Sequence, residues 1–178
     1  MFDTVSGLPV HALVIHAVVV LLPLMALVTI AFTARPRWRP ALPWAILGNL
    51  VALGSAYVAV QSGEKLQTRL SVQAQQPIAT EHGDLGASMP YFAVALVVAS
   101  VLAYLLVGRT GRRQRPAQDG ARYGTRRDAA PRTSPVAAVL AVLLVLGAGG
   151  ASSFWAYRVG DSGAKAVWKD TIANTTAP

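Results

Sequence analysis

The chain is dominated by four apolar runs, each long enough to cross the hydrocarbon core of a bilayer, which takes about 20 residues in a helix. A segment in lipid must satisfy its backbone hydrogen bonds internally, so each run is expected to be helical. Hydrophobic residues make up 53% of the chain and charged residues 13%, which is too apolar for an ordinary soluble domain. We therefore predict an all-α integral membrane protein, a single domain over residues 1–178 that forms a four-helix bundle with spans at residues 10–32, 42–60, 88–107 and 135–157.

The basic residues predict how these helices are oriented. Of the 16 Lys and Arg, eleven lie in the first and third connections, and five lie in the middle connection and the C-terminal tail. Lys and Arg are enriched in cytoplasmic loops, so the first and third connections are expected in the cytoplasm. Both termini and the middle connection are then expected on the outer side. Residues 108–134, rich in Gly, Pro and Arg, are predicted to form a disordered Arg-rich cytoplasmic loop.

Composition also limits the location and the partners of the chain. The net charge of +8 is typical of nucleic-acid binding, but Arg clustering beside apolar spans explains it more simply, so we expect no nucleic-acid partner. Frequent Ala and Arg are typical of a multi-pass protein of the bacterial plasma (inner) membrane. The expected partner is the lipid bilayer, with other membrane-protein subunits or further copies of the chain as candidates. The absence of cysteine excludes disulfides, thiolate metal sites and iron–sulfur ligation.

The polar residues of chemical interest fall at the predicted outer side. His11 and His16 lie in the outer half of the first span, and His82 lies just before the third. Glu64 follows the second span and Asp161 follows the fourth, whereas the cytoplasmic half is expected to hold only Arg and apolar residues. Ionisable groups at bilayer depth are costly unless they are paired, so these residues are candidates for a functional site.

The spacing of the histidines suggests different roles. His11 and His16 are five residues apart, which places their side chains about 140° apart around a helix with about 7 Å of rise between them. They are therefore poor joint ligands of one small ion, and one should face the bundle interior while the other meets a different partner. His16 is deeper and has apolar neighbours, which favours it as an axial haem ligand. His82 could supply the opposite ligand if its helix begins early enough, with His11 as an alternative ligand or a supporting residue.

Other interpretations of the outer side are open. Each histidine could instead donate a hydrogen bond to a neighbouring helix, or serve a non-haem metal site or a proton relay. The HxxxH, HExxH and CxxC patterns of metal sites are absent, and nothing resembles a nucleophile elbow. We therefore predict no catalytic residues. A patch of small residues at 147–151 is expected to allow close helix packing, and no repeat of fixed period is visible.

Several segments resemble a known family. The chain opens with GLPVH at residues 7–11 and continues with IH at 15–16, and its last span is followed by RVGDSGAKAVW at 158–168. SGEKL at 62–66 and the surroundings of His82 also correspond. The sequence is thereby identified as a member of the bacterial four-helix predicted membrane proteins of the DUF2231 family, a domain of unknown function. The resemblance covers all four spans.

The resemblance implies an electron-transfer role. Some members of the family are joined to Rieske-type iron–sulfur modules or resemble membrane cytochromes, which makes haem the natural candidate cofactor. Two positions depart from the family pattern: Ala17 follows His16 where relatives often have a Phe-Pro step, and Asp161 stands where many relatives have His. The second departure removes one candidate ligand or replaces it with a carboxylate.

Two functional hypotheses follow. The first is a small membrane protein that binds b-type haem near the outer leaflet in a redox role, with His16 and His82 as iron ligands and His11 close by. The second is a cofactor-free accessory or structural subunit of a larger membrane complex of the respiratory type. Transport of protons or a metal ion through Glu64, His82 and Asp161 is a weaker third, because a full pathway also needs a charged residue deep in the inner half.

Overall fold

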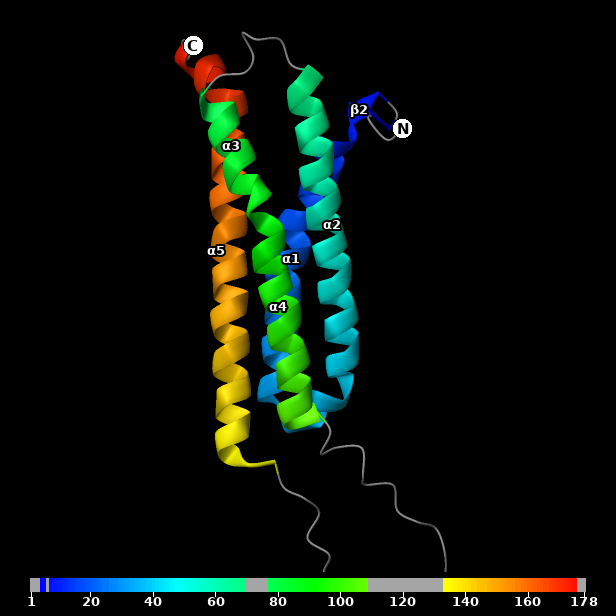
Figure 1. Ribbon diagram of the computed structural model, residues 1–178. Coiled ribbons are helices and arrows are strands. Elements are labelled where there is room, and N and C mark those ends of the chain that lie inside the picture. Colours follow the sequence, from blue (N-terminus) through cyan, green and yellow to red (C-terminus); the bar gives the residue numbers. More distant parts are fainter. Residues whose placement is uncertain (1–3, 6, 70–76, 109–132, 176–178) are drawn as a thin grey trace, which may run out of the picture.

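The fold is a bundle of long helices (Figure 1). The computed structural model describes residues 4–5, 7–69, 77–108 and 133–175. Within these, the chain forms the helices α1 (Val10–Ala34), α2 (Leu42–Arg69), α3 (Pro77–Ala87), α4 (Met89–Ala103) and α5 (Pro135–Ala173). Helices α3 and α4 follow one another through Ser88 and together form one member of the bundle. The predicted all-α, four-helix architecture is confirmed for the described residues, while most of the predicted Arg-rich loop, residues 109–132, lies outside them.

Short elements connect and cap the long helices. Strands β1 (Thr4–Val5) and β2 (Leu8–Pro9) form an antiparallel hairpin before α1, and Gly7 in its turn has a φ of 81°, a conformation that favours glycine. The 3-10 helix η1 (Pro36–Ala41) joins α1 to α2, and the π-helical turn η3 (Tyr104–Gly108) ends α4.

Four candidate membrane spans match the predicted apolar runs, and this is a multi-pass membrane protein. The helices nevertheless extend well past the apolar runs at one end of the bundle. A helix of 39 residues, such as α5, is about 58 Å long, whereas a hydrocarbon core is about 30 Å thick. The candidate spans are Val10–Ala34, Pro36–Thr68, Ala79–Gly108 and Pro135–Lys169.

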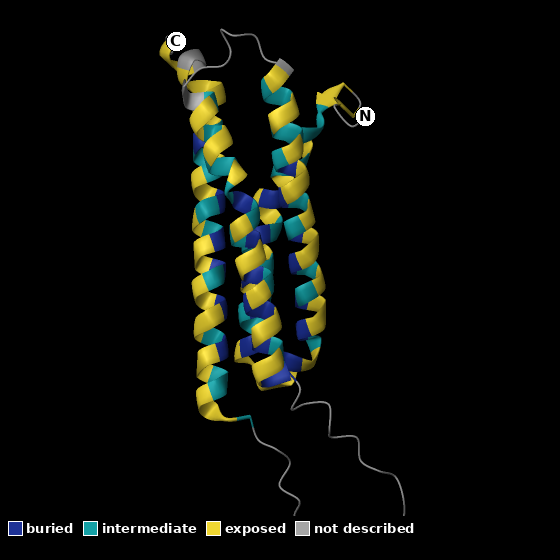
Figure 2. Cartoon of the chain, in the orientation of Figure 1, coloured by how far each residue is buried: buried dark blue, intermediate teal, exposed yellow. Residues whose placement is uncertain are grey.

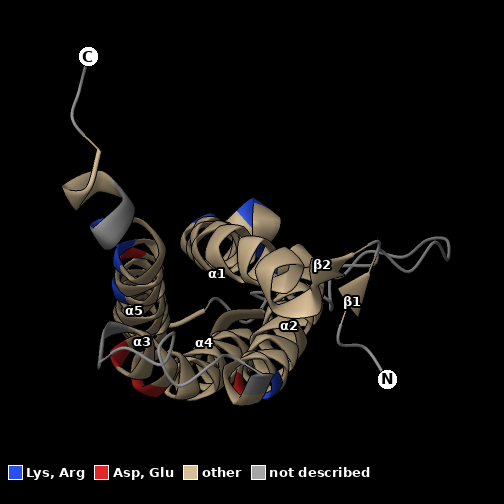
Figure 3. Cartoon of the chain, turned by 90° about the horizontal axis from the view of Figure 1, so that it is seen from above, with Lys and Arg blue, Asp and Glu red and all other residues tan. Residues whose placement is uncertain are grey.

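Each bundle member packs against two neighbours. Helix α1 contacts α2 and α5, and α4 contacts the same two helices on the opposite side of the bundle (Figure 3). Buried residues face inward and exposed apolar residues face outward along every helix (Figure 2). The interior is built largely from small side chains, which lets helix backbones approach closely. One cluster of these comprises Ala26, Ala52, Ala56, Ala93 and Ala156, with Val18, Leu22, Met89 and Leu96.

The two ends of the bundle differ in polarity. The described N- and C-terminal ends lie at one end of the bundle, together with the end of α2 and the start of α3, whereas η1 and its Arg residues lie at the other (Figure 1). Three described arginines belong to this second end, and Arg39 among them is 9% exposed. We call the first end the histidine end, because His11 and His82 lie there on α1 and α3.

The half of the bundle away from the histidine end is not purely apolar, contrary to the sequence prediction. Thr29 and Thr33 of α1 and Asn49 of α2 are buried there, together with Ser100 of α4. Asn49 Nδ2 donates a hydrogen bond to Thr29 Oγ1 at 3.0 Å, and Thr33 donates to the Thr29 carbonyl at 2.7 Å. The prediction missed this cluster because single uncharged polar residues barely lower the mean hydropathy of a span.

Candidate functional site

The imidazole rings of His11 and His82 meet at the histidine end of the bundle. Their centroids are 6.2 Å apart, and the ring planes are inclined by 74°. Each ring is partly buried. The two histidines come from different pairs of helices, since His11 starts α1 and His82 lies within α3. The contact therefore joins the α1–α2 side of the bundle to the α3–α5 side.

His11 is held against α2. Its Nδ1 lies 2.8 Å from the carbonyl oxygen of Ala59. A carbonyl can only accept a hydrogen bond, so Nδ1 must carry the hydrogen. In the neutral ring, Nε2 is then the nitrogen with a free lone pair, which is the form that binds metals.

His82 is held against α5 in the same way. Its Nδ1 lies 3.1 Å from the carbonyl oxygen of Val159 and 3.1 Å from Ser162 Oγ. The Ser162 hydroxyl donates to the Val159 carbonyl at 2.9 Å, so its oxygen is available to accept from the imidazole. His82 therefore also carries its hydrogen on Nδ1 and leaves Nε2 free.

A glycine makes room for each ring. A Cβ atom on Gly63 would lie 2.9 Å from Cε1 and Nδ1 of His11. A Cβ atom on Gly163 would lie 2.9 Å from Cε1 and 3.2 Å from Nδ1 of His82. Contacts this short force a shift, so a larger residue at either position would displace the imidazole from the helix that binds it. Neither glycine was predicted from the sequence to be a site residue.

The structure separates His16 from this pair. His16 is exposed on the face of α1 that points away from the bundle interior, and its Nδ1 donates to the carbonyl of Ala12 one turn earlier at 2.6 Å. The expected division between the two N-terminal histidines is present, but it is His11 that faces the bundle. The ring that contacts His82 is consequently that of His11. The physical reason is the angle of about 140° between the two positions, which turns one outward when the other faces α2.

The helix that carries His82 begins earlier than predicted. Helix α3 starts at Pro77, so His82 is a helical residue at the level of His11. Trp155 of α5 supports the junction of α3 and α4, because its Nε1 donates to the Leu85 carbonyl at 3.1 Å and its ring stacks on Phe92 at 4.7 Å. The early start of α3 was not predicted from the sequence, because Gly83, Asp84 and Gly86 lower the local hydropathy. Packing on α5 stabilises the helix there nonetheless.

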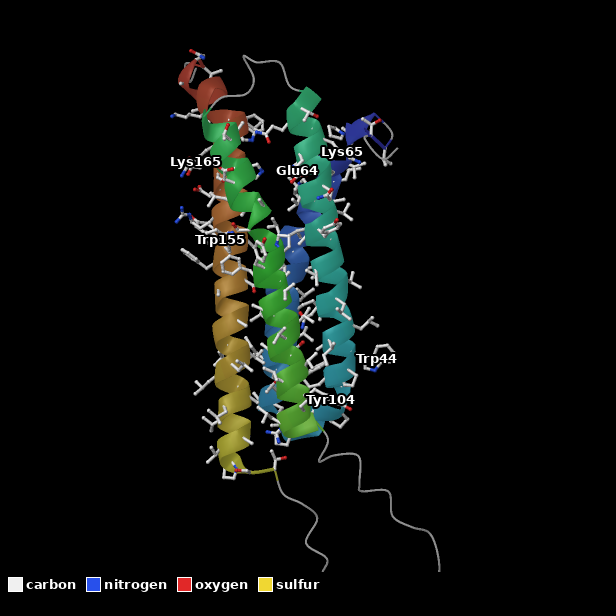
Figure 4. The ribbon with its side chains drawn as sticks, in the orientation of Figure 1. Trp44, Glu64, Lys65, Tyr104, Trp155 and Lys165 are labelled. Carbon is white, nitrogen blue, oxygen red and sulfur yellow. The ribbon has the colours of Figure 1, made fainter. Side chains whose placement is uncertain are left out.

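The acidic residues of the sequence prediction make no described hydrogen bond to the histidine pair. Glu64 is exposed on α2, near Lys65 (Figure 4). Asp161 pairs with Lys165 one turn later on α5, with a separation of 2.7 Å between Oδ2 and Nζ. Neither acid is bonded to a histidine in the described hydrogen bonds, and the described residues contain no group of three or more His, Cys, Asp or Glu able to hold a metal ion. The site thus offers two imidazoles and no protein carboxylate.

These features define a class of protein: a multi-pass helical membrane protein with a partly buried histidine pair at one end of its bundle. The chain belongs to the predicted membrane protein family DUF2231, whose model matches residues 7–176. No curated protein and no solved structure gives a significant match.

Proposed function

We propose that this protein is a small membrane redox protein in which His11 and His82 would hold a b-type haem at the histidine end. The observation that carries the proposal is the pairing of two imidazoles from different helices, each bonded through Nδ1 to a backbone carbonyl. Metal-ligating histidines almost always donate their second ring nitrogen in this way, which fixes the tautomer and the ring orientation.

The two rings lie close enough to contact one bound group together, since their centroids are 6.2 Å apart. The number of ligands favours haem over a bare ion. A structural zinc ion takes four ligands from the protein, whereas haem needs only one or two protein ligands. The pair of His11 and His82 would supply two.

The residues of the chain would position and shield the haem. When bound, haem supplies one-electron exchange at its iron. Ala59 and Val159 would keep Nε2 of each histidine unprotonated by occupying Nδ1, and Ser162 would add a second contact to His82. The partial burial of both rings would limit access of water. In the described hydrogen bonds the two histidines contact backbone carbonyls and Ser162 and no acidic or basic side chain, which favours electron transfer over acid–base catalysis.

We place the histidine end on the outer side of a bacterial plasma membrane, within one four-helix domain. The support is the distribution of Arg, because Arg35, Arg37 and Arg39 lie at the opposite end of the bundle. Single cysteines provide the test, since the natural chain has none. In intact cells a membrane-impermeant maleimide should label Thr68→Cys, and should label Arg37→Cys only after permeabilisation. The reverse pattern would overturn the orientation.

The haem proposal is tested by absorption spectra of the detergent-purified protein, oxidised and dithionite-reduced. A Soret band with sharp reduced α and β bands is expected. His11→Ala and His82→Ala should each abolish these bands, whereas the matched variant His16→Ala should retain them because His16 lies outside the pair. A colourless wild-type protein at full expression, or haem loss on His16→Ala alone, would refute the assignment.

One observation favours a second function, a cofactor-free accessory subunit of a larger membrane complex. Both histidines already tie helices together, His11 joining α1 to α2 and His82 joining α3 to α5. In this function the histidine pair would do no more than hold the helices together through these hydrogen bonds. Stoichiometric copurification of other subunits in mild detergent, with no chromophore, supports this function over the first.

A further inference from the structure

The two halves of the candidate site are built alike. His11 bonds to the carbonyl of Ala59, which lies three residues before Ser62-Gly63 on α2. The same arrangement recurs at His82, which bonds to a carbonyl three residues before another Ser-Gly pair on α5. In both helices the Ser hydroxyl donates to that carbonyl, at 3.1 Å in α2 and 2.9 Å in α5, and the Gly admits the imidazole. The second set comprises Val159, Ser162 and Gly163.

The correspondence extends along the whole of α2 and α5. Residues of the two helices that differ by 100 in number face the bundle interior together. The pattern Ser-Gly-x-Lys begins at Ser62 and again at Ser162. The buried matched pairs are Ala45 with Val145, Asn49 with Gly149, Ala52 with Ser152, and Ala56 with Ala156.

Helix α1 corresponds in the same manner to α3 and α4, where the residue numbers of matched positions differ by 71. This relation places His11 on His82, and it also matches buried apolar positions deeper in the bundle. A hydroxyl-bearing residue occupies the same place in each, since Thr29 and Ser100 are both fully buried and both donate to a carbonyl of their own helix. The buried apolar pairs are Val18 with Met89 and Leu22 with Ala93.

The two differences in residue number, 71 for the first helix of each unit and 100 for the second, are consistent with one insertion. They differ by 100 − 71 = 29 residues, and this is the number by which the stretch 106–141 of the second half exceeds the matching stretch 35–41 of the first. The packing agrees as well. Exchanging α1 with α4 and α2 with α5 maps the contacts α1–α2 and α1–α5 onto α4–α5 and α4–α2, all of which are present.

We propose that the chain is an internal duplication of a two-helix unit, and that the histidine pair lies on the two-fold axis that relates the units. The axis runs along the bundle, because corresponding helices run in the same direction (Figure 1). The site is then formed by two equivalent units, each a histidine, a backbone carbonyl and a glycine. The duplication deepens the proposed function, and its consequence for the ligand rests on that function. A ligand on this axis would be one that offers the same chemistry to both histidines, and a haem held by the two rings would meet this requirement.

The duplication is tested on the full chain by distances between spin labels. Four exposed positions form two equivalent pairs, Val20 with Tyr91 and Tyr57 with Tyr157, and the natural chain has no cysteine to label. A two-fold axis requires the distance 20–57 to equal 91–157, and the distance 20–157 to equal 57–91. Double electron–electron resonance on these four double-cysteine variants should give two coincident pairs of distance distributions. Clearly separate maxima within a pair would overturn the duplication.

The equivalence of the two units is tested by matched glycine variants. Gly63→Ala and Gly163→Ala should lower the thermal unfolding midpoint in detergent by similar amounts, because each Cβ meets an imidazole at 2.9 Å. Gly54→Ala and Gly150→Ala are the controls on the same helices, since nothing lies within 4 Å of their added Cβ. An effect confined to one of the two site glycines would overturn the two-fold site.

The two proposals fail separately. The label distances do not depend on haem, so a colourless protein with coincident distances refutes the proposed function and retains the duplication. A protein with haem whose distances do not coincide refutes the duplication and retains the proposed function.

Discussion

Ser162 Oγ lies 3.1 Å from Nδ1 of His82 while its own hydrogen is donated to the Val159 carbonyl at 2.9 Å. This hydroxyl links the histidine to α5 in a way that has no counterpart at His11. Ser62, the matching residue of α2, donates to the carbonyls of Val58 and Ala59 and makes no described bond to an imidazole. The two halves of the site are thus alike in their backbone contacts and differ in this side chain.

Ser162→Ala should therefore be the more costly of two matched substitutions. It removes a buried acceptor from His82, and a lost hydrogen bond of this kind costs about 1 kcal/mol. Ser62→Ala removes only a bond within its own helix and should leave the free energy of unfolding nearly unchanged. Thermal unfolding followed by circular dichroism in one detergent compares the two. Equal losses would show that the contact with His82 contributes nothing.

The buried Asn49 gives a prediction about pairing in the other half of the bundle. Thr29→Val removes the acceptor of Asn49 Nδ2, and an unsatisfied buried donor costs about 1–3 kcal/mol. Adding Asn49→Leu should restore the stability, because Asn49 Oδ1 also lacks a partner among the described contacts. Unfolding of the single and double variants in detergent checks this. A double variant as unstable as Thr29→Val alone would contradict the prediction.

Gly149 determines how closely α5 approaches α1. A Cβ at this position would lie 3.0 Å from the Cβ of Ala26, so Gly149→Val should force the helices apart at a cost of about 1–3 kcal/mol. The control is Gly150→Val, which introduces the same β-branched side chain with nothing within 4 Å of its Cβ. The difference between their unfolding midpoints isolates the packing effect from helix propensity. Identical midpoints would argue against close α1–α5 packing.

Arg39 joins η1 by hydrogen bonds to the end of α1 and to Thr133, which precedes α5. Its Nε donates to the Thr33 carbonyl at 3.1 Å and its Nη1 to Thr133 Oγ1 at 3.3 Å. Hydrogen bonds that involve a charged group contribute about 1.5–3 kcal/mol, so Arg39→Gln should destabilise the protein by an amount of this order. Arg37→Gln is the matched control on the exposed side of η1. Equal stability of the two variants in chemical or thermal unfolding would contradict this role.

The sequence was sufficient to predict the class of fold. Four apolar runs of spanning length can satisfy their backbone only as helices, and the four-helix architecture is confirmed. The spacing of His11 and His16 also predicts that they face different directions, because helix geometry alone fixes that angle.

The partners of each histidine could not be predicted, because they depend on tertiary packing. Hydropathy places the start of the third helix near residue 88, whereas contacts with α5, including the Trp155 bond to Leu85, extend the helix back to Pro77 and bring His82 beside His11. The roles of Gly63 and Gly163 were equally hidden, since a glycine in a helix has no sequence pattern of its own. The recurrence of Ser-Gly-x-Lys was a visible signal, but the longer connection before α5 prevents any constant spacing.

Both ends of the described chain lie at the histidine end of the bundle, opposite η1 (Figure 1). This arrangement makes the two termini natural attachment points for reporters of the compartment that the histidine end faces. A fluorescent or enzymatic reporter fused at either terminus would lie on that side of the bundle, and the two fusions should agree with each other in every host. An electron donor or acceptor tethered at either terminus would likewise lie at the histidine end of the bundle. The same short linker could therefore be used at either terminus.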